Sequence, residues 1–211
     1  MNRILVLSAF LCVFVLTASF GISPDDFKFA YGQWDMEGNR LVQSDLDAGM
    51  ARVDIPYSQN GIATYEFNVQ YRKGGEDDQH AGLGMHLFVD KPAPGKAWGN
   101  GKSYLLWLNY DANADGISTG LSAQVYKSLN HSQMKLVADF DLNKFAPLLV
   151  ASNMDLIIPV KIVVNGITGD VKVYDPTVKN WVYEFNLGNS NPLSGNYVSL
   201  RTNSASFSFG M

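Results

Sequence analysis

The sequence predicts an all-β protein, a two-sheet antiparallel β-sandwich formed by a single domain. Apolar and polar residues alternate at every second position in many short segments, which is the period of a strand with one buried side. Gly, Asn, Asp and Pro separate these segments, as they do at turns. The composition agrees, because 19 Gly, 12 Phe, 10 Tyr and 4 Trp in 211 residues, with little glutamate, are typical of strands and turns rather than helices.

The clearest strand is expected at residues 62–71. Its odd-numbered residues, from Ala63 to Tyr71, are apolar, and its even-numbered residues, from Thr64 to Gln70, are polar. Successive side chains of a strand point to opposite faces, so this strand has one buried and one outward side. Similar alternation predicts further strands at residues 40–44, 50–55, 83–90, 104–110, 121–126, 160–164, 171–173, 181–187, 197–201 and 205–209.

The segments between these strands also carry signals. Asn165-Gly166 predicts a hairpin turn, and Pro176 predicts the end of the strand before it. Residues 142–152 are the one segment expected to form a short helix. Roughly a dozen strands, without an internal repeat or a linker, predict one sandwich domain over residues 22–211.

Residues 1–21 are expected to be a cleavable signal peptide. A positive residue precedes an apolar run at residues 4–16, and small residues follow as far as Gly21. The run is short for a membrane span, which needs about 20 apolar residues, so a retained anchor is the less favoured alternative. Cys12, the one cysteine, lies inside the run and is interpreted as a small hydrophobe rather than a lipid-attachment site. The mature chain is therefore expected to be exported, by a bacterial route, to the periplasm or the exterior, with neither a transmembrane anchor nor a disulfide.

Four segments in the second half carry a resemblance to a known superfamily. They read Val-Lys-Ile-Val-Val-Asn-Gly at 160–166, Val-Lys-Val-Tyr-Asp at 171–175, Trp-Val-Tyr-Glu-Phe at 181–185 and Gly-Asn-Tyr-Val-Ser-Leu-Arg-Thr at 195–202. They resemble the late strands of concanavalin A-like (laminin G-like) jelly rolls, and residues 104–126 look like the central strands. The resemblance implies a jelly roll. The superfamily includes lectins, glycosidases, lyases and structural modules, so the resemblance leaves the function open.

Catalytic carboxylates are the first candidate chemistry. Retaining glycosidases of this architecture carry Glu-x-Asp-x-x-Glu along one strand, because two carboxylates about 5 Å apart flank the scissile bond. The sequence contains no such run. If the protein is an enzyme, Glu66 and Glu184 are the candidate pair, meeting across strands. A solvated strand face is the favoured interpretation of both. The three histidines do not have a zinc-like spacing.

Residues 111–116 form the sharpest local motif. Asp111, Asn113 and Asp115 place three oxygen-bearing side chains at alternate positions before a turning glycine, as at the start of a calcium loop. The twelfth position is Ser122 instead of the bidentate Glu, and no helices are expected on either side. A polar hairpin loop explains the same residues. The sequence requires no cofactor, and Ca²⁺ is the one candidate.

The outward sides of the central strands form the candidate ligand-binding face. If Tyr65, Met85, Leu106 and Val125 face the core, the opposite sides of their strands combine aromatic, amide and acidic groups. These are Glu66, Asn68, His86, Trp107, Asn109, Gln124 and Tyr126. Sugars stack their C–H faces on aromatic rings and hydrogen-bond to planar polar groups, so the set predicts a shallow glycan groove. Two alternatives remain: an ordinary solvated face, and a Trp107 covered by the loop at residues 91–102.

That loop is long for a compact domain, and long connections often carry function. Trp98 lies near its tip, close to Gly95 and Gly99, and is expected to stack on a ligand or contact a partner. The alternative is a hydrophobic plug that fixes the loop to the sheet.

Charge and composition narrow the function. A net charge of −4 without a basic stripe argues against a nucleic-acid partner. The first prediction is a non-catalytic module that binds a glycan or another cell-envelope component. The second is a structural protein that assembles with other envelope or surface-filament proteins. The third is a glycoside hydrolase or polysaccharide lyase.

Overall fold

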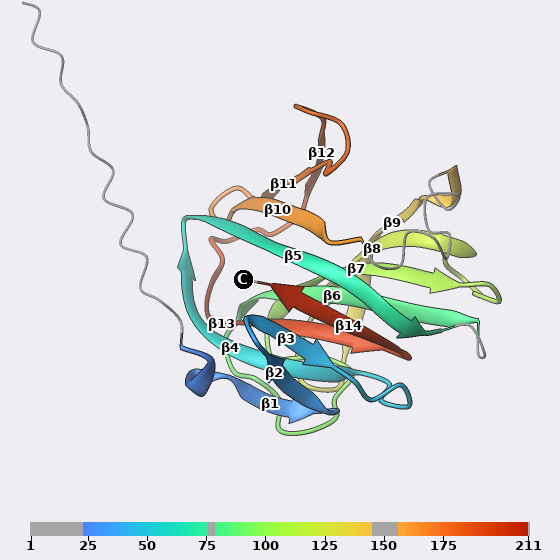
Figure 1. Ribbon diagram of the computed structural model, residues 1–211. Coiled ribbons are helices and arrows are strands. Elements are labelled where there is room, and N and C mark those ends of the chain that lie inside the picture. Colours follow the sequence, from blue (N-terminus) through green and yellow to red (C-terminus); the bar gives the residue numbers. More distant parts are fainter. Residues whose placement is uncertain (1–22, 76–78, 145–155, 211) are drawn as a thin grey trace, which may run out of the picture.

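The computed structural model describes residues 23–75, 79–144 and 156–210. These form two antiparallel β-sheets of seven strands each, packed face to face (Figure 1). The predicted two-sheet antiparallel sandwich is confirmed. The predicted signal peptide at 1–21 and most of the predicted helix at 142–152 lie outside the described residues.

Sheet A has the strand order β1-β4-β13-β6-β7-β8-β9. Its strands are β1 (Lys28–Tyr31), β4 (Ala51–Asn60), β13 (Ser194–Asn203), β6 (His80–Val89), β7 (Ser103–Asp111), β8 (Gly120–Ser128) and β9 (Met134–Asp141). Sheet B has the order β12-β11-β10-β5-β14-β3-β2. Its strands are β12 (Val182–Asn186), β11 (Asp170–Tyr174), β10 (Ile158–Asn165), β5 (Ile62–Gly74), β14 (Ala205–Gly210), β3 (Arg40–Gln43) and β2 (Trp34–Glu37). A short 3-10 helix, Pro24–Asp26, precedes β1.

Strand positions follow the sequence pattern except at sheet edges. The periodicity did not predict β1, β2 or β9, which lie at three of the four edges. The strands β1 and β2 have four residues each, too few for a clear alternation. In β9 no side chain is fully buried, and the strand contains the charged residues Lys135 and Asp139. Charged edge strands protect a sheet from pairing with another chain, but they weaken the apolar signal that identifies a strand.

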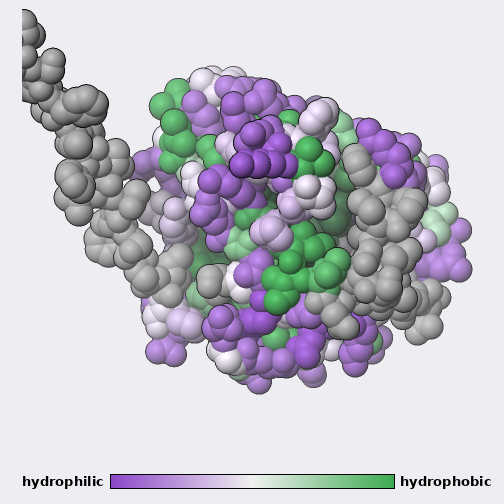
Figure 2. Space-filling model, turned by 45° about the horizontal axis from the view of Figure 1, so that its top comes forward, coloured by the Kyte–Doolittle hydropathy of each residue, from purple (hydrophilic) through white to green (hydrophobic). Residues whose placement is uncertain are grey.

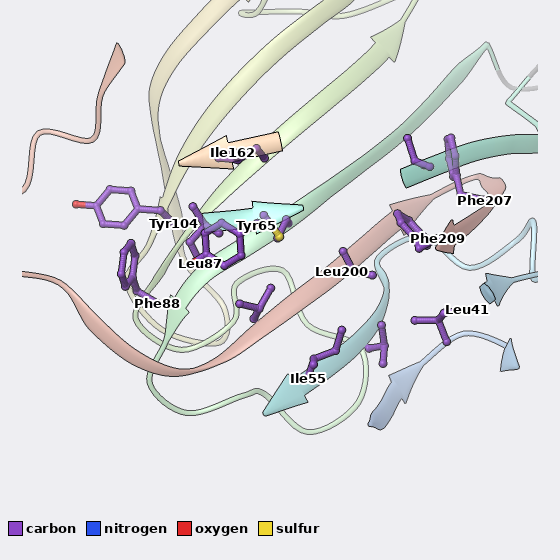
Figure 3. Close-up of a cluster of buried hydrophobic side chains, with 14 of the residues drawn as sticks. Leu41, Ile55, Tyr65, Leu87, Phe88, Tyr104, Ile162, Leu200, Phe207 and Phe209 are labelled. Atoms are coloured by element: carbon purple, nitrogen blue, oxygen red, sulfur yellow. The ribbon is translucent and has the colours of Figure 1, made fainter. Parts of the chain in front are cut away.

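The core lies between the two sheets and contains the side chains that the alternation assigned to it (Figure 3). Tyr65, Met85 and Val125 are buried in it, and Leu106 packs against it. Leu87 from sheet A and Phe209 from sheet B are both 0 % exposed, so apolar side chains of both sheets close the interior. This burial supplies the main favourable free energy of folding.

The turn predicted after β10 is also confirmed. Asn165 ends the strand, and its side-chain Oδ1 accepts hydrogen bonds from the backbone N–H groups of Ile167 (3.0 Å) and Thr168 (3.3 Å). Gly169, with φ of +80°, then leads into β11. Figure 2 shows one face of the molecule, mostly hydrophilic with hydrophobic residues toward its middle. The described part of the chain contains no helix with the length and hydropathy of a membrane span.

Candidate functional site

The candidate site lies on the outer face of sheet A, the face turned away from sheet B. Strand pairing aligns Arg201, Gly84, Trp107, Gln124 and Asp139 in one row across β13, β6, β7, β8 and β9. The next row contains Ser199, His86, Leu105 and Tyr126. The row on the other side contains Gly82, Asn109 and Ser122. Five of the predicted site residues therefore share one face: His86, Trp107, Asn109, Gln124 and Tyr126.

Two glycines of β6 create the space in which Trp107 lies. A Cβ atom at Gly82 would lie 2.0 Å from Trp107 Cζ2, and one at Gly84 would lie 2.7 Å from Trp107 Cε3. Only a residue without a side chain fits at these positions, so the indole packs against the backbone of β6. Trp107 Nε1 donates a 3.0 Å hydrogen bond to Asn109 Oδ1, which fixes the ring further. The indole is 8 % exposed, and its role is to form the floor of the site.

A loop at residues 90–102, named the cover loop here, connects β6 to β7 and packs on this face. Asp90 Oδ1 closes the loop at its base by accepting from the backbone N–H groups of Lys91 and Lys102, both at 2.7 Å. Asn100 is completely buried, and its N–H donates to Ser128 Oγ at 2.9 Å. Of the two alternatives for this face, the one in which the loop covers Trp107 therefore fits the buried part of the face.

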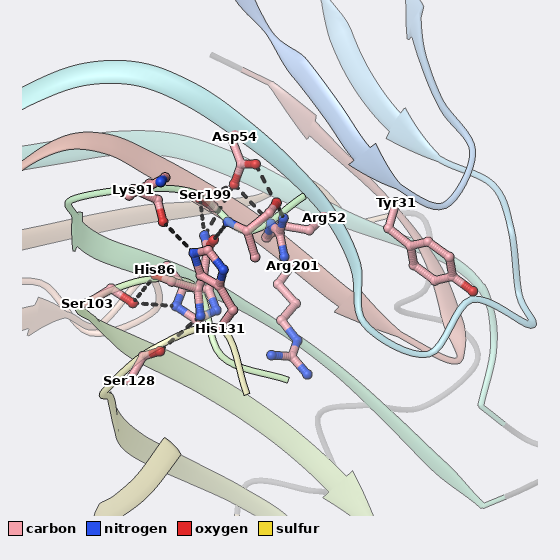
Figure 4. A network of polar contacts seen from close by, with 12 residues as sticks. Tyr31, Arg52, Asp54, His86, Lys91, Ser103, Ser128, His131, Ser199 and Arg201 are labelled. Atoms are coloured by element: carbon pink, nitrogen blue, oxygen red, sulfur yellow. Dashed lines mark hydrogen bonds and ion pairs between the residues drawn. The ribbon is translucent and has the colours of Figure 1, made fainter. Parts of the chain in front are cut away.

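A buried ion pair holds the cover loop to the sheet (Figure 4). Asp54 Oδ1 accepts hydrogen bonds from Arg52 Nε (3.0 Å), Ser199 Oγ (2.6 Å) and Asn100 Nδ2 (3.2 Å). Arg52 Nη2 donates to the backbone oxygen of Ala93 in the loop. Both charged side chains are nearly inaccessible to solvent, and pairing and hydrogen bonding offset the cost of burying the two charges. The pair therefore fixes the loop in one position.

His86 belongs to this network and is not a surface residue. Its ring is fully buried, and Nδ1 lies 3.0 Å from Ser103 Oγ, which donates to the backbone oxygen of Asn100. Because the Ser103 proton is used there, Nδ1 carries the proton of the neutral ring and donates to Ser103. Burial, and then the nearby charges of Arg201 and Arg52, hold the pKa of His86 well below its usual value. His86 was expected on the outward side of its strand, and it lies there, but the cover loop buries its ring beneath the accessible surface.

Arg201 lies between two tryptophans. Its guanidinium carbon is 5.2 Å from the ring centre of Trp98 and 5.6 Å from that of Trp107. Its Nη1 donates a 2.7 Å hydrogen bond to the backbone oxygen of Trp98. Burial, and then the positive charge of Arg52, lower the pKa of Arg201 to about 10. The cation links the tip of the cover loop to the floor of the site.

The accessible part of the site is formed by Trp98, Tyr126 and Asn109. Trp98 is 44 % exposed, and its ring meets the half-buried ring of Tyr126 edge to face at 6.2 Å. Asn109 is half-buried beside Trp107. Tyr126 donates from its hydroxyl to Gln124 Oε1 at 2.9 Å, and Gln124 is almost fully buried. Gln124, His86 and Trp107 therefore support the surface from below.

Glu66 and Asn68 are not part of this site, and their predicted place on the same face is wrong. Both lie on β5 in sheet B and point away from sheet A. Glu66 forms an exposed ion pair with Lys161 at 2.6 Å, and Asn68 accepts a hydrogen bond from Arg40. Alternation in the sequence separates inward from outward sides, but it does not say to which sheet a strand belongs.

The structure also does not bring Glu66 and Glu184 together. Glu184 lies on β12, and β11 and β10 separate that strand from β5. At about 4.8 Å per strand, the backbones of β12 and β5 are roughly 14 Å apart, which does not suit a glycosidase pair of carboxylates. Each is also in an ion pair, Glu184 with Lys172 at 2.8 Å and Glu66 with Lys161.

The candidate calcium residues lie in the loop between β7 and β8. Asp111 is half-buried, and Asn113 and Asp115 are exposed. Asp111 Oδ1 accepts a 2.9 Å hydrogen bond from the N–H of Asn113, which is the geometry of an Asx turn. Among the described residues there is no cluster of three or more His, Cys, Asp or Glu side chains with metal-binding geometry. These contacts agree with the alternative interpretation of residues 111–116 as a polar hairpin loop.

Sequence reasoning did not identify Arg52, Asp54, Asn100 or Arg201. A signal for three of them was present. Arg52 and Asp54 alternate with apolar residues in β4, and Arg201 does so in β13. Charged residues at outward positions normally indicate solvent, and only the packing of the cover loop makes them buried.

The sequence matches no protein-family model and no curated protein. Solved structures do match. A carbohydrate-binding module, CBM66, from Bacillus subtilis aligns with a TM-score of 0.54 and 15% identity over 90% of this chain and 94% of that chain. A B. subtilis protein of unknown function with a galectin-like fold aligns with a TM-score of 0.53 and 12% identity over 88% of this chain and 87% of that chain. A legume lectin-like domain from Entamoeba histolytica aligns with a TM-score of 0.50 and 10% identity over 88% of this chain and 87% of that chain.

These similarities, together with the two seven-stranded sheets, establish the fold. The protein has a jelly-roll fold similar to that of concanavalin A-like proteins, as the resemblance of its late strands implied.

Proposed function

We propose that this protein is an exported, non-catalytic module that binds a glycan on the surface formed by Trp98, Tyr126 and Asn109. The observation that carries the proposal is a large, partly exposed indole held over a buried polar network. Exposed aromatic side chains that a protein fixes in place usually contact a ligand or partner. Carbohydrate-binding proteins among the structural neighbours support the same class of ligand.

The arrangement suits sugar binding physically. Trp98 and Tyr126 offer flat apolar surfaces for the C–H face of a sugar ring, and Asn109 offers an amide for hydroxyl groups. The loop that carries Trp98 is already ordered by Asp54, Asn100 and Arg201, so binding does not have to order it. A preorganised surface loses less conformational entropy when the ligand binds.

A glycan-array screen of residues 22–211 tests the proposal, with Trp98→Ala as the variant. The matched control is Trp181→Ala, because Trp181 is 57 % exposed and precedes β12 in the other sheet. We expect binding to be lost in Trp98→Ala and kept in Trp181→Ala. Equal binding by both variants, or no binding by the folded wild-type protein, contradicts the proposal.

Assembly with other envelope proteins is the second candidate function, and one observation favours it. Val178, Trp181 and Tyr183 are exposed at β12, an edge strand of sheet B whose outer side is unpaired among the described residues. Exposed apolar side chains beside a free strand edge are typical of interfaces between chains. Sedimentation at increasing protein concentration tests this function: association that Trp181→Ala removes supports it, and a monomer at all concentrations contradicts it.

Export is tested separately. We propose that residues 1–21 direct the chain out of the bacterial cytoplasm and are then removed. Expression of the full chain in a bacterium, followed by intact-mass measurement of the periplasmic and extracellular fractions, should give a chain that begins after Ser19 or Gly21. A full-length chain that stays in the cytoplasm contradicts export.

A further inference from the structure

Arg201 is a buried cation for which the described residues provide no carboxylate. Arg201 is 4 % exposed, and it forms no ion pair with an Asp or Glu of the described residues. Asp54, the one buried carboxylate among the described residues, is already bound by Arg52, Ser199 and Asn100. The outer face of sheet A therefore contains a positive charge that its own side chains do not balance.

The hydrogen-bonding capacity of the guanidinium is also largely unused. Within the described part of the chain, Nη1 donates to the backbone oxygen of Trp98, and Nε has no partner although it is buried. The rings of Trp98 and Trp107 both lie within cation–π distance of it and offset part of the cost of burial. In Figure 4 the guanidinium of Arg201 points away from the cluster around Asp54. Arg201 is thus separate from the ion pair that holds the loop.

We propose that Arg201 binds the carboxylate of an acidic sugar, so that the ligands of this site are glycans that contain uronic acids. The inference rests on the glycan-binding surface proposed above and names its substrate class. A guanidinium presents its donors in a planar fork that matches a carboxylate, and such charge-assisted hydrogen bonds are among the strongest in proteins. The sugar ring would lie against Trp98 and Tyr126.

The position of Trp98 is compatible with this mode of binding. Its backbone oxygen holds the guanidinium, whereas its indole is partly exposed and forms the outer cover of the cation. This mode of binding requires the indole to turn outward, a movement of the side chain that leaves the backbone hydrogen bond in place. Tyr126, Gln124 and Asn109 contribute hydroxyl and amide groups to this face. The acidic residue of the row, Asp139, lies on β9, four strands from Arg201, and its charge acts on Tyr126.

The test compares oligomers of galacturonate, glucuronate and mannuronate with the same oligomers after chemical reduction of their carboxylates to hydroxymethyl groups. Binding is measured by calorimetry on residues 22–211. We expect at least one acidic oligomer to bind about tenfold more tightly than its reduced form. In Arg201→Gln that preference should disappear, and in Arg72→Gln it should remain. Arg72 is a suitable control because it pairs with Glu37 on the far sheet.

The outcomes separate this inference from the proposed function. Equal or tighter binding of a reduced oligomer overturns the acidic-sugar inference and leaves glycan binding intact. Failure of every acidic and neutral oligomer to bind contradicts both. If Arg201→Gln does not fold, the wild-type protein still decides, because raising the salt from about 0.05 to about 0.5 M should weaken binding of the acidic oligomer but not of a neutral one. Binding of the acidic oligomer that salt does not change overturns the inference.

Discussion

Asp54 offers the sharpest test of how the site is built. Replacing Asp54 with Asn keeps the shape of the side chain but leaves the charge of Arg52 buried without a partner. Breaking a buried ion pair in this way costs about 3–5 kcal/mol. The three donors that reach Oδ1, at 3.0, 2.6 and 3.2 Å, meet an uncharged and weaker acceptor in Asn, and an NH2 group replaces Oδ2 beside Arg52 Nη2, so we expect a loss within that range.

Urea unfolding measured by tryptophan fluorescence gives the free energy of unfolding and shows whether the transition remains two-state. The matched control is Glu66→Gln, which removes the acid of an exposed ion pair with Lys161. That pair has a shorter distance, 2.6 Å, but its side chains are 46 % and 62 % exposed. Exposed pairs contribute about 0–1 kcal/mol, so the control should lose little stability.

A second variant separates the buried charge from the other contacts of Asp54. In the double variant Arg52→Met, Asp54→Asn, the charge of Arg52 that lost its partner is removed as well, and part of the lost stability should return. The reasoning is wrong if Asp54→Asn costs less than about 1 kcal/mol, the range of an exposed pair. It is also wrong if the double variant is less stable than Asp54→Asn alone.

Three further predictions follow from the same face. Below about pH 6.5 His86 takes up a proton in the unfolded chain but not in the folded protein, so the free energy of unfolding should fall by up to about 1.4 kcal/mol per pH unit on acidification and stay level above pH 6.5. Unfolding curves from pH 5 to 8 should show this slope in the wild-type protein and not in His86→Gln. A level wild-type curve would contradict the prediction. Gly84→Ala places a Cβ 2.2 Å from the backbone oxygen of Leu106 and 2.7 Å from Trp107, so we expect the free energy of unfolding to fall by about 1–3 kcal/mol and the tryptophan fluorescence spectrum to change. A variant as stable as the wild-type protein would show that β6 and β7 move apart easily. A chelator should leave glycan binding unchanged, because Asp111 Oδ1 is used within its own turn. A calcium site would be identified if the chelator removed binding, if added Ca²⁺ restored it, and if Asp111→Asn did not bind even with Ca²⁺.

The sequence pattern predicted the inward and outward side of each central strand, because strand periodicity is a local property. It did not predict the neighbours of a strand. Glu66 and His86 both occupy outward positions, but β5 and β6 belong to different sheets, so the two side chains lie on opposite sides of the molecule. Register between distant strands, as between Arg201 and Gly84, depends on the whole fold.

Burial on the outer face was also beyond local pattern. Arg52, Asp54 and Arg201 look solvated in the sequence because charged side chains usually are. The cover loop buries them by supplying Asn100 and the backbone oxygens of Ala93 and Trp98. Trp98 was identified because an aromatic residue in a long loop is conspicuous without knowledge of its partners. A site assembled from one loop and several strands is therefore only partly visible in the sequence.

The late strands β13 and β14 have a consequence for folding. The strand β13 lies between β4 and β6, and β14 lies between β5 and β3, so the segment at residues 194–210 supplies an interior strand to each sheet. The hydrogen bond between Ser199 and Asp54 joins residues 145 positions apart. Neither sheet can be completed, and the buried ion pair cannot acquire all its partners, until this segment has been synthesised. Such non-local topology folds slowly, so a newly made chain stays unfolded for longer than one whose contacts are local.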